Sequence, residues 1–283
     1  MKKTFSRWIL ASAVAGLMAA CSPSENKSTE ITADLPWKHG VALYSFNKFP
    51  FPQTLEKADS AGLAYVEGFS FHKLGPEFGD KTLLQLDDQE IEKLRNFIQE
   101  QGLTMASIYV GDAKTPEQWI HYFEMGKKLG LEFFVSEPRA DEWDLLDSLG
   151  KAYNIKTAIH QHAKGESYYW HPDSVLKASN GRPFIGACGD VGHWTRSGLD
   201  PIECLKSLEN NLISVHLKDV SVANELKPEY VVIGQGVLDF AGIAKELKRQ
   251  NFGGYVYIEQ EANWFHNLPD VKAGLEHFTK VAQ

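Results

Sequence analysis

Short apolar segments alternate eight times with amphipathic segments along this chain, and this alternation most constrains its fold. Each amphipathic segment has apolar residues at helical spacing, as in residues 87–102, where Ile91, Leu94 and Ile98 recur and Gly102 ends the pattern. Each apolar segment is short enough to be a buried strand. The expected strands span residues 39–46, 63–70, 103–110, 131–138, 155–163, 183–193, 212–220 and 254–262.

Strands that alternate with helices indicate parallel strands joined by right-handed crossovers. Eight strand–helix units within roughly 245 residues match the size of a (β/α)8 barrel, the TIM barrel fold. A doubly wound open sheet is the alternative, but no Gly-rich phosphate-binding loop follows an early strand. No linker longer than a loop divides the chain, so we expect a single-domain α/β TIM barrel over residues 37–283.

The first 20 residues have the layout of a secretory signal peptide. A basic start is followed by an apolar run from Trp8 to Ala20 that is too short for a comfortable membrane span. The run ends in "LMAAC", which resembles the lipobox of bacterial lipoproteins and predicts a lipid on Cys21. Residues 21–36 then form a polar, flexible tether. We expect an exported, membrane-anchored lipoprotein of the periplasm or cell surface; an ordinary signal peptide with a chance cysteine is the alternative.

The charge balance argues against a nucleic-acid partner. The chain has 37 Asp and Glu residues against 29 Lys and Arg residues, and removal of a basic signal peptide makes it more acidic still. Such a surface repels phosphate backbones. Beyond the predicted lipid site only Cys188 and Cys204 remain, and we expect both to be buried free thiols.

Carboxylates and imidazoles recur where the expected strands end, which is the end of a TIM barrel that carries catalytic residues. Any one of them could be a helix cap or a surface charge. Every strand from the fourth to the eighth supplies one, however, and so many acids in one mouth would repel unless a divalent cation were bound. The expected ligands are three carboxylates and one imidazole, a set that suits Mn²⁺, Mg²⁺ or Co²⁺: Glu137, Asp190, Glu259 and His216.

Three motifs carry a resemblance to a known superfamily. "DVGHW" after the sixth strand, "HLKD" on the seventh and "YIEQE" on the eighth are similar to the xylose isomerase-like barrels. These include sugar phosphate isomerases and epimerases, inosose dehydratase, hydroxypyruvate isomerase and ketose 3-epimerases. The resemblance covers about residues 37–283 and implies metal ligands at Asp190, His216 and Glu259. The fourth ligand is Glu137, as in inosose dehydratase, with His160 as the alternative; Mn²⁺ is the expected ion, before Mg²⁺, Co²⁺ or Zn²⁺.

The resemblance also implies a mechanism, which is proton abstraction next to a carbonyl through a metal-stabilised enediolate. In this scheme Glu259 serves as ligand and base, His162 as acid or base, and Lys218 stabilises the oxyanion. A salt bridge to a rim acid is the structural alternative for Lys218 and for Arg196. The implied catalytic residues are Glu259, His162, Lys218 and Glu137, and the implied substrate-binding residues are His193, Arg196, Glu67 and Trp264.

We therefore expect a metal-dependent isomerase or epimerase that acts on an unphosphorylated sugar or keto-sugar. The first alternative is a lyase or dehydratase that cleaves 3-keto-glycosides or dehydrates keto-sugars by β-elimination. A less favoured alternative is a non-catalytic sugar-binding lipoprotein. The expected partners are a small-molecule sugar and, through the lipid anchor alone, a membrane; self-association into a homo-oligomer is left open.

Overall fold

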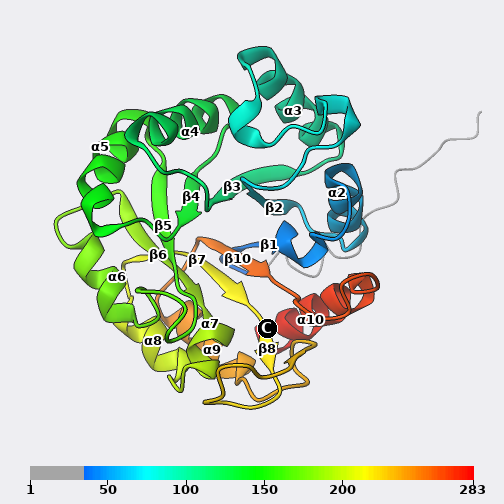
Figure 1. Ribbon diagram of the computed structural model, residues 1–283. Coiled ribbons are helices and arrows are strands. Elements are labelled where there is room, and N and C mark those ends of the chain that lie inside the picture. Colours follow the sequence, from blue (N-terminus) through cyan, green and yellow to red (C-terminus); the bar gives the residue numbers. More distant parts are fainter. Residues whose placement is uncertain (1–34) are drawn as a thin grey trace, which may run out of the picture.

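Eight parallel strands close into a barrel with helices around it (Figure 1). The computed structural model of the chain describes residues 35–283. Around the barrel the strands follow the order β1-β10-β7-β6-β5-β4-β3-β2. Each barrel strand therefore lies beside the next barrel strand in the chain, and the last, β10, closes the barrel against β1. The barrel strands are β1 (Lys38–Ala42), β2 (Tyr65–Phe69), β3 (Thr104–Val110), β4 (Phe133–Ser136), β5 (Lys156–His160), β6 (Ile185–Asp190), β7 (Leu212–Leu217) and β10 (Tyr255–Ile258).

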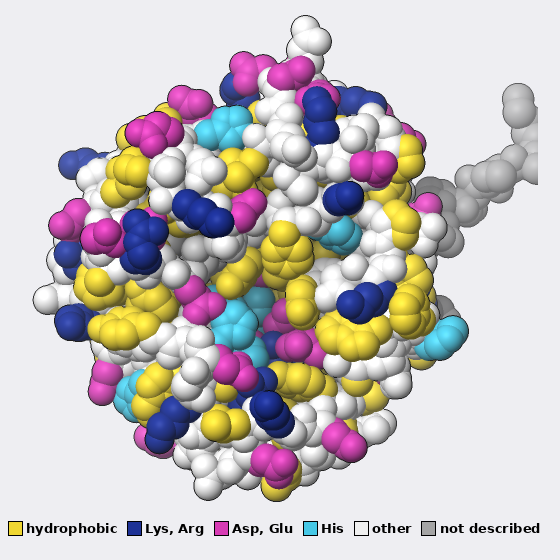
Figure 2. Space-filling model, viewed as in Figure 1, with side chains coloured by type: hydrophobic (Ala, Val, Ile, Leu, Met, Phe, Trp, Pro, Cys, Tyr) yellow, Lys and Arg dark blue, Asp and Glu magenta, His cyan; other side chains and the backbone are white. Residues whose placement is uncertain are grey.

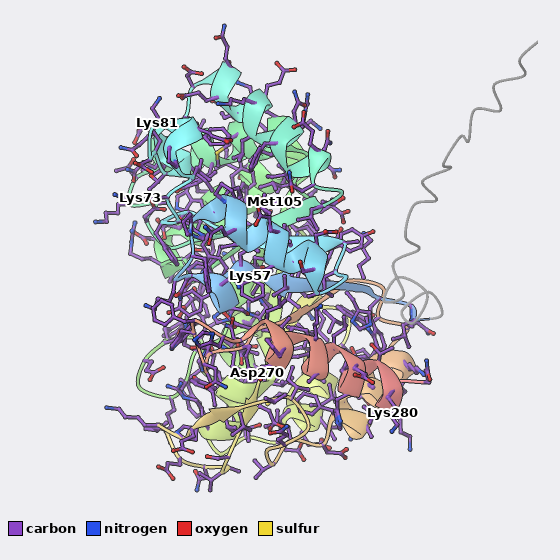
Figure 3. All side chains as sticks on the ribbon, turned by 90° about the vertical axis from the view of Figure 1, so that its right-hand side faces the viewer. Lys57, Lys73, Lys81, Met105, Asp270 and Lys280 are labelled. Atoms are coloured by element: carbon purple, nitrogen blue, oxygen red, sulfur yellow. The ribbon has the colours of Figure 1, made fainter. Side chains whose placement is uncertain are left out.

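The helices form an outer ring, and local capping explains where several of them begin. Thr115 accepts a hydrogen bond from the backbone N–H of Gln118 and so caps α4, with Pro116 next in the chain. In the side view (Figure 3), α10 carries Asp270 near its start and Lys280 near its end, which suits the helix dipole. The helices are α2 (Phe51–Ser60), α3 (Asp88–Glu100), α4 (Pro116–Leu129), α5 (Trp143–Tyr153), α6 (Pro172–Ser179), α7 (Val191–Arg196), α8 (Pro201–Ser207), α9 (Phe240–Arg249) and α10 (Leu268–Val281).

Most of the observed strands end earlier than expected, and at the first and the sixth a helix follows directly. The first strand ends at Ala42, four residues early, and Leu43–Phe46 forms a 3₁₀ helix. Within this helix, Ser45 Oγ accepts a hydrogen bond of 2.9 Å from the backbone N–H of Gln260, which follows β10. The sixth strand ends at Asp190, and α7 begins at the next residue.

The structure confirms a TIM barrel and also adds a small feature. After β7, strands β8 (Asp219–Val220) and β9 (Tyr230–Val231) form an antiparallel pair that extends one loop at the mouth. Within residues 35–283 no helix is long and apolar enough to cross a membrane. The predicted signal peptide, Cys21 and nearly all of the tether lie outside the described residues. Cys188 and Cys204 are buried and free, as predicted.

Candidate active site and metal centre

A pocket of about 340 Å³ lies at the C-terminal ends of the barrel strands. Figure 2 shows its mouth, with histidine and acidic side chains deep in the hollow and hydrophobic side chains near it. A larger hollow of about 660 Å³ lies at the opposite end of the barrel, beside Lys38, Glu132 and Tyr255. We place the candidate site in the smaller pocket, because its walls hold most of the histidines and acids that end the strands.

Asp190 has two separate tasks, one for each carboxylate oxygen. The side chain is fully buried, and Oδ1 accepts a hydrogen bond of 2.8 Å from the backbone N–H of His193, which caps α7. Oδ2 faces Lys218 Nζ at 3.0 Å and His160 Nε2 at 3.4 Å. The motif "DVGHW" is therefore a helix start as well as a candidate ligand position.

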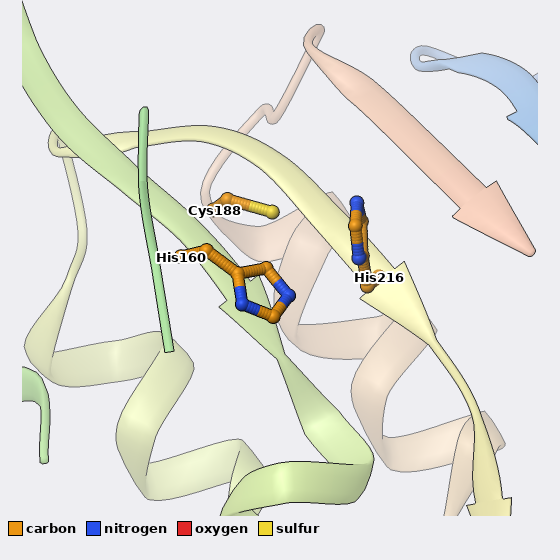
Figure 4. A group of neighbouring side chains, drawn as sticks. All are labelled: His160, Cys188 and His216. Carbon is orange, nitrogen blue, oxygen red and sulfur yellow. The ribbon is translucent and has the colours of Figure 1, made fainter. Parts of the chain in front are cut away.

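Four buried side chains converge beside Asp190 Oδ2 and could hold a metal ion. One donor atom from each lies within 4.8 Å of those of the other three. His216 Nδ1, for example, is 3.0 Å from Glu259 Oε2. Figure 4 shows His160 and His216 on β5 and β7, with Cys188 of the intervening β6 beside them. The four residues, which we call the metal cluster, are His160, Asp190, His216 and Glu259.

Glu137, one of the expected ligands, lies outside the metal cluster. It forms a neighbouring group with His160 and His162. Its carboxylate contacts His162 Nδ1 and Ser167 Oγ, and accepts a hydrogen bond of 3.2 Å from Tyr109 OH. Because these three groups hold Glu137 beyond the end of β4, the geometry favours the alternative, His160, as the fourth member of the cluster.

Lys218 balances the charge of the site acids. Its ammonium lies 2.7 Å from Glu259 Oε2 and 2.5 Å from Glu261 Oε1, in addition to its contact with Asp190. Burial would lower the pKa of Lys218, but these three acids raise it well above its ordinary value. Burial would likewise raise the pKa of Glu259, but Lys218 and His216 lower it. Lys218 thus forms the salt bridges with rim acids that were the alternative to an oxyanion-stabilising role, and it does so at the edge of the metal cluster.

Gly192 explains how the Lys218 side chain reaches this position. A Cβ atom at residue 192 would lie 2.2 Å from Lys218 Cγ, so only glycine lets α7 approach the lysine so closely. The "DVGHW" motif therefore supplies both a candidate ligand and the space for its counter-ion.

Glu67 was expected to bind substrate, but the structure places it away from the residues that line the pocket. The side chain is fully buried inside the barrel, and Oε1 is 3.0 Å from His216 Nε2. Oε2 accepts a hydrogen bond of 2.9 Å from Ser107 Oγ. His216 thus lies between Glu67 at Nε2 and Glu259 at Nδ1, and a carboxylate in the place of Glu67 is a common orienting partner of histidines that bind metals.

The remaining predicted substrate contacts divide into two groups. His193 and Arg196 line the pocket, and Arg196 binds the Glu166 carboxylate and Tyr230 OH. Trp264 is not among the residues that line the pocket; its ring packs edge-on against Tyr44, with the centroids 5.8 Å apart.

Aromatic side chains on one side of the pocket were missed from the sequence. Tyr44, Phe69, Phe71 and Tyr109 all line it and follow or end the first three strands. The sequence did contain a sign of this aromatic surface, since the first three strands carry aromatic residues at or just after their ends, where the later strands carry ionisable ones. Tyr230 was also missed, because the two-residue strand β9 that carries it is too short to show a periodic pattern.

Comparison with known proteins identifies the family. A family model described as "Xylose isomerase-like TIM barrel" matches residues 55–281. The chain belongs to this family. Inosose dehydratase from Clostridium botulinum is 27% identical over 165 residues, which are 50% of this chain and 53% of the relative. The chain thus spans about half the length of the curated relatives it matches.

Two solved structures agree with the fold. An uncharacterized protein from Parabacteroides distasonis has a TM-score of 0.71 at 30% identity, over 87% of this chain and 99% of the other. The IolI protein with a bound zinc atom has a TM-score of 0.70 at 18% identity, over 87% and 98%. In this xylose isomerase-like barrel, the donor atoms of His160, Asp190, His216 and Glu259 lie close enough together to hold a metal ion.

Proposed function

We propose that this protein is a divalent-metal-dependent enzyme that abstracts a proton next to the carbonyl group of an unphosphorylated sugar, as a sugar isomerase or epimerase. The observation that carries the proposal is the metal cluster beneath the pocket, with the Glu137–His162 pair beside it. A binding protein without chemistry needs hydroxyl contacts and aromatic rings, but it does not need two buried imidazoles and two buried carboxylates with converging donor atoms.

The metal cluster fits a divalent cation. Its four donors are two imidazole nitrogens and two carboxylate oxygens, and the Asp190 and Glu259 carboxyls have pKa values below the ordinary range, so both are ionised. Two imidazoles favour Zn²⁺, Mn²⁺ or Co²⁺ over Mg²⁺. Such an ion supplies Lewis acidity to the carbonyl oxygen and the adjacent hydroxyl of a sugar. Mn²⁺ remains our first choice for testing, with Zn²⁺ beside it.

His162 is the group we assign to proton transfer. It lines the pocket, and Glu137 holds its Nδ1, which orients the ring as the acid of a catalytic triad orients its histidine. Burial would lower the pKa of His162, but Glu137 raises it above its ordinary value. His162 takes the proton from the carbon, and the C–H electron pair moves toward the carbonyl. Return of the proton to the neighbouring carbon, with the hydroxyl proton passing to the former carbonyl oxygen, isomerises the sugar; delivery of a proton to the opposite face of the same carbon epimerises it.

The charges around the pocket support an unphosphorylated substrate. Lys218 and Arg196 line it, and each already has an acid partner. Glu166 and Glu261 add negative charge to the same walls. Because no lysine or arginine among the described lining residues is left without an acid, a phosphate group would meet repulsion here. The predicted export of the chain supports the same conclusion independently.

A lyase is the second candidate, and two observations favour it. The curated relatives with the same barrel include inosose dehydratases. His160 also ends β5, with the Glu137–His162 pair next to it. An epimerase that uses two glutamate bases would have its second glutamate at this strand. In elimination the same C–H electron pair forms a carbon–carbon double bond and expels the group on the next carbon. The expelled group takes the proton.

Deuterium exchange distinguishes these outcomes. The protein is stripped with EDTA, restored with Mn²⁺ or Zn²⁺, and incubated in D₂O with keto-sugars and 3-keto-glycosides while NMR spectra are recorded. Deuterium on a retained carbon would establish isomerisation or epimerisation, and loss of water or an aglycone would establish the lyase. Turnover that is unchanged in both Asp190→Ala and His216→Ala would contradict the proposed metal dependence.

A further inference from the structure

Four aromatic rings form a continuous surface on one side of the pocket, which we call the aromatic wall: Tyr44, Phe69, Phe71 and Tyr109. The rings of Phe69 and Tyr109 stack, with centroids 5.5 Å apart and planes 23° apart. The ring of Phe71 lies 5.4 Å from that of Phe69, and the ring of Tyr44 lies 5.5 Å from it. The opposite side of the pocket is polar, with Arg196, Glu166 and Tyr230 bound to one another.

The aromatic wall runs from the ionisable groups out to solvent. At its inner end, the ring of Tyr109 is 5.8 Å from that of His160, and its OH is 3.2 Å from Glu137 Oε1. Phe69 is only 6% exposed, but Phe71 at the outer end is 47% exposed. A ligand bound over the metal cluster would therefore have aromatic surface beside it and further aromatic surface beyond it, toward the mouth.

One sugar ring does not account for the whole wall. A sugar that presents its hydroxyl groups to the metal cluster offers one apolar face to stack on an aromatic ring, and Tyr109 already lies beside the cluster. Phe71 extends farther out, and a large apolar side chain left half-exposed at a pocket mouth is a common mark of a ligand surface. The second half of the wall thus needs a second group on the ligand.

We infer that the pocket accepts a sugar that carries a second ring, and that Phe69 and Phe71 bind this ring through its apolar face. This inference rests on the proposed function in one respect, that the sugar lies over the metal cluster. The second ring is the aglycone of a glycoside, either an aryl group or the C–H face of another sugar. Aryl and sugar rings share the apolar face that an aromatic side chain recognises.

The assignment gives the lyase a defined leaving group. In a 3-keto-glycoside, removal of the proton from C2 leaves its electron pair to form the C1–C2 double bond. The bond between C1 and the glycosidic oxygen then breaks, and its electron pair goes to that oxygen. The oxygen takes a proton from His162, and the aglycone departs as an alcohol while the sugar keeps its carbonyl group. No oxidant or reductant is consumed, and the leaving group is the part held by Phe69 and Phe71.

Binding of unreactive glycosides tests the inference without requiring turnover. Metal-restored protein is titrated calorimetrically with methyl glucoside, 4-nitrophenyl glucoside and cellobiose, using both anomers of the first two. We expect 4-nitrophenyl glucoside, cellobiose or both to bind about three- to tenfold more tightly than methyl glucoside, the gain expected of one aromatic contact. Phe71→Ala should remove this preference, and Phe71→Trp should keep it.

Phe265→Ala is the matched control. Phe265 is 65% exposed but lies outside the pocket lining, so its removal should leave all affinities unchanged. A preference for the aryl compound alone identifies an aryl aglycone, and a preference for cellobiose alone identifies a second sugar. Equal affinities in the wild type, no binding of any of the three, or a preference that survives Phe71→Ala would each overturn the inference. Failure of the proposed chemistry is separate, since it appears as absent deuterium exchange with the binding preference intact.

Discussion

The two ends of the barrel each carry a lysine, a glutamate and a tyrosine, and they differ in burial. At the N-terminal end, Lys38 Nζ is 3.1 Å from Glu132 Oε1, with side chains 37% and 55% exposed. At the C-terminal end, Lys218 Nζ is 2.7 Å from Glu259 Oε2, with side chains 2% and 6% exposed. Water screens the first pair, whereas the second is held among other buried charges that are costly to keep. A fold retains buried charges of this kind where function requires them, and the contrast locates the site.

The largest expected effect comes from Asp190→Asn at the C-terminal end of the barrel, where the charges are buried. The change removes one ligand charge and leaves Lys218 with fewer acids, while the amide can still cap α7. We expect metal affinity to fall by more than about a hundredfold, beyond the range that outer partners of a ligand cost, and turnover to fall to background. Metal titration followed by calorimetry checks the affinity, and unchanged thermal unfolding serves as the control. Wild-type affinity in this variant would remove Asp190 from the site.

His162→Gln tests the proton-transfer role of His162, at the same C-terminal end of the barrel. Loss of a general acid or base costs about a hundred- to ten-thousandfold in kcat. Metal affinity should stay near that of the wild type, since His162 is not in the metal cluster. Glu137→Gln should show the same pattern more weakly, because Glu137 orients His162 without replacing it. A large loss of metal affinity in Glu137→Gln would instead return Glu137 to the ligand set.

Glu67→Gln probes the buried support beneath His216. The amide can keep the hydrogen bond from Ser107 but loses the charge next to His216 Nε2. Removal of such a partner costs about tenfold to a hundredfold in metal affinity. The KM of a sugar substrate should change far less, because Glu67 is buried away from the pocket. A variant that changes KM alone would contradict the positioning role.

The smallest effect is expected at the exposed end. Lys38→Ala breaks the pair with Glu132, and exposed pairs contribute at most about 1 kcal/mol to the free energy of unfolding. Urea denaturation should show a change within this limit, and turnover and metal affinity should match the wild type. A tenfold loss of activity would mean that the two ends of the barrel are coupled.

The fold was predictable because the alternation of strand and helix patterns, which specifies a barrel, repeats along the whole of residues 37–283. Because parallel strands end at one rim, Asp190, His216 and Glu259 were predicted to meet, and the structure brings them together. The role of Glu67 was not predictable, because it depends on depth within the barrel, and β2 shifts register against β3 between Val66 and Glu67. That shift cannot be read from one strand alone.

The choice between Glu137 and His160 was also beyond the sequence. Both residues follow the same pattern of an ionisable group at a strand end. What separates them is where β4 stops, at Ser136, and which neighbours then hold the Glu137 carboxylate. These neighbours include Ser167, which lies 30 residues away in the chain, so no local pattern contains the answer.

Anomalous diffraction from crystals grown with Mn²⁺, recorded above and below the manganese absorption edge, tests the central claim most directly. The metal cluster predicts one strong peak bounded by His160, Asp190, His216 and Glu259, and its loss in crystals of Asp190→Asn. The absence of a peak at this position, or a peak beside Glu137 and His162 instead, would contradict the account.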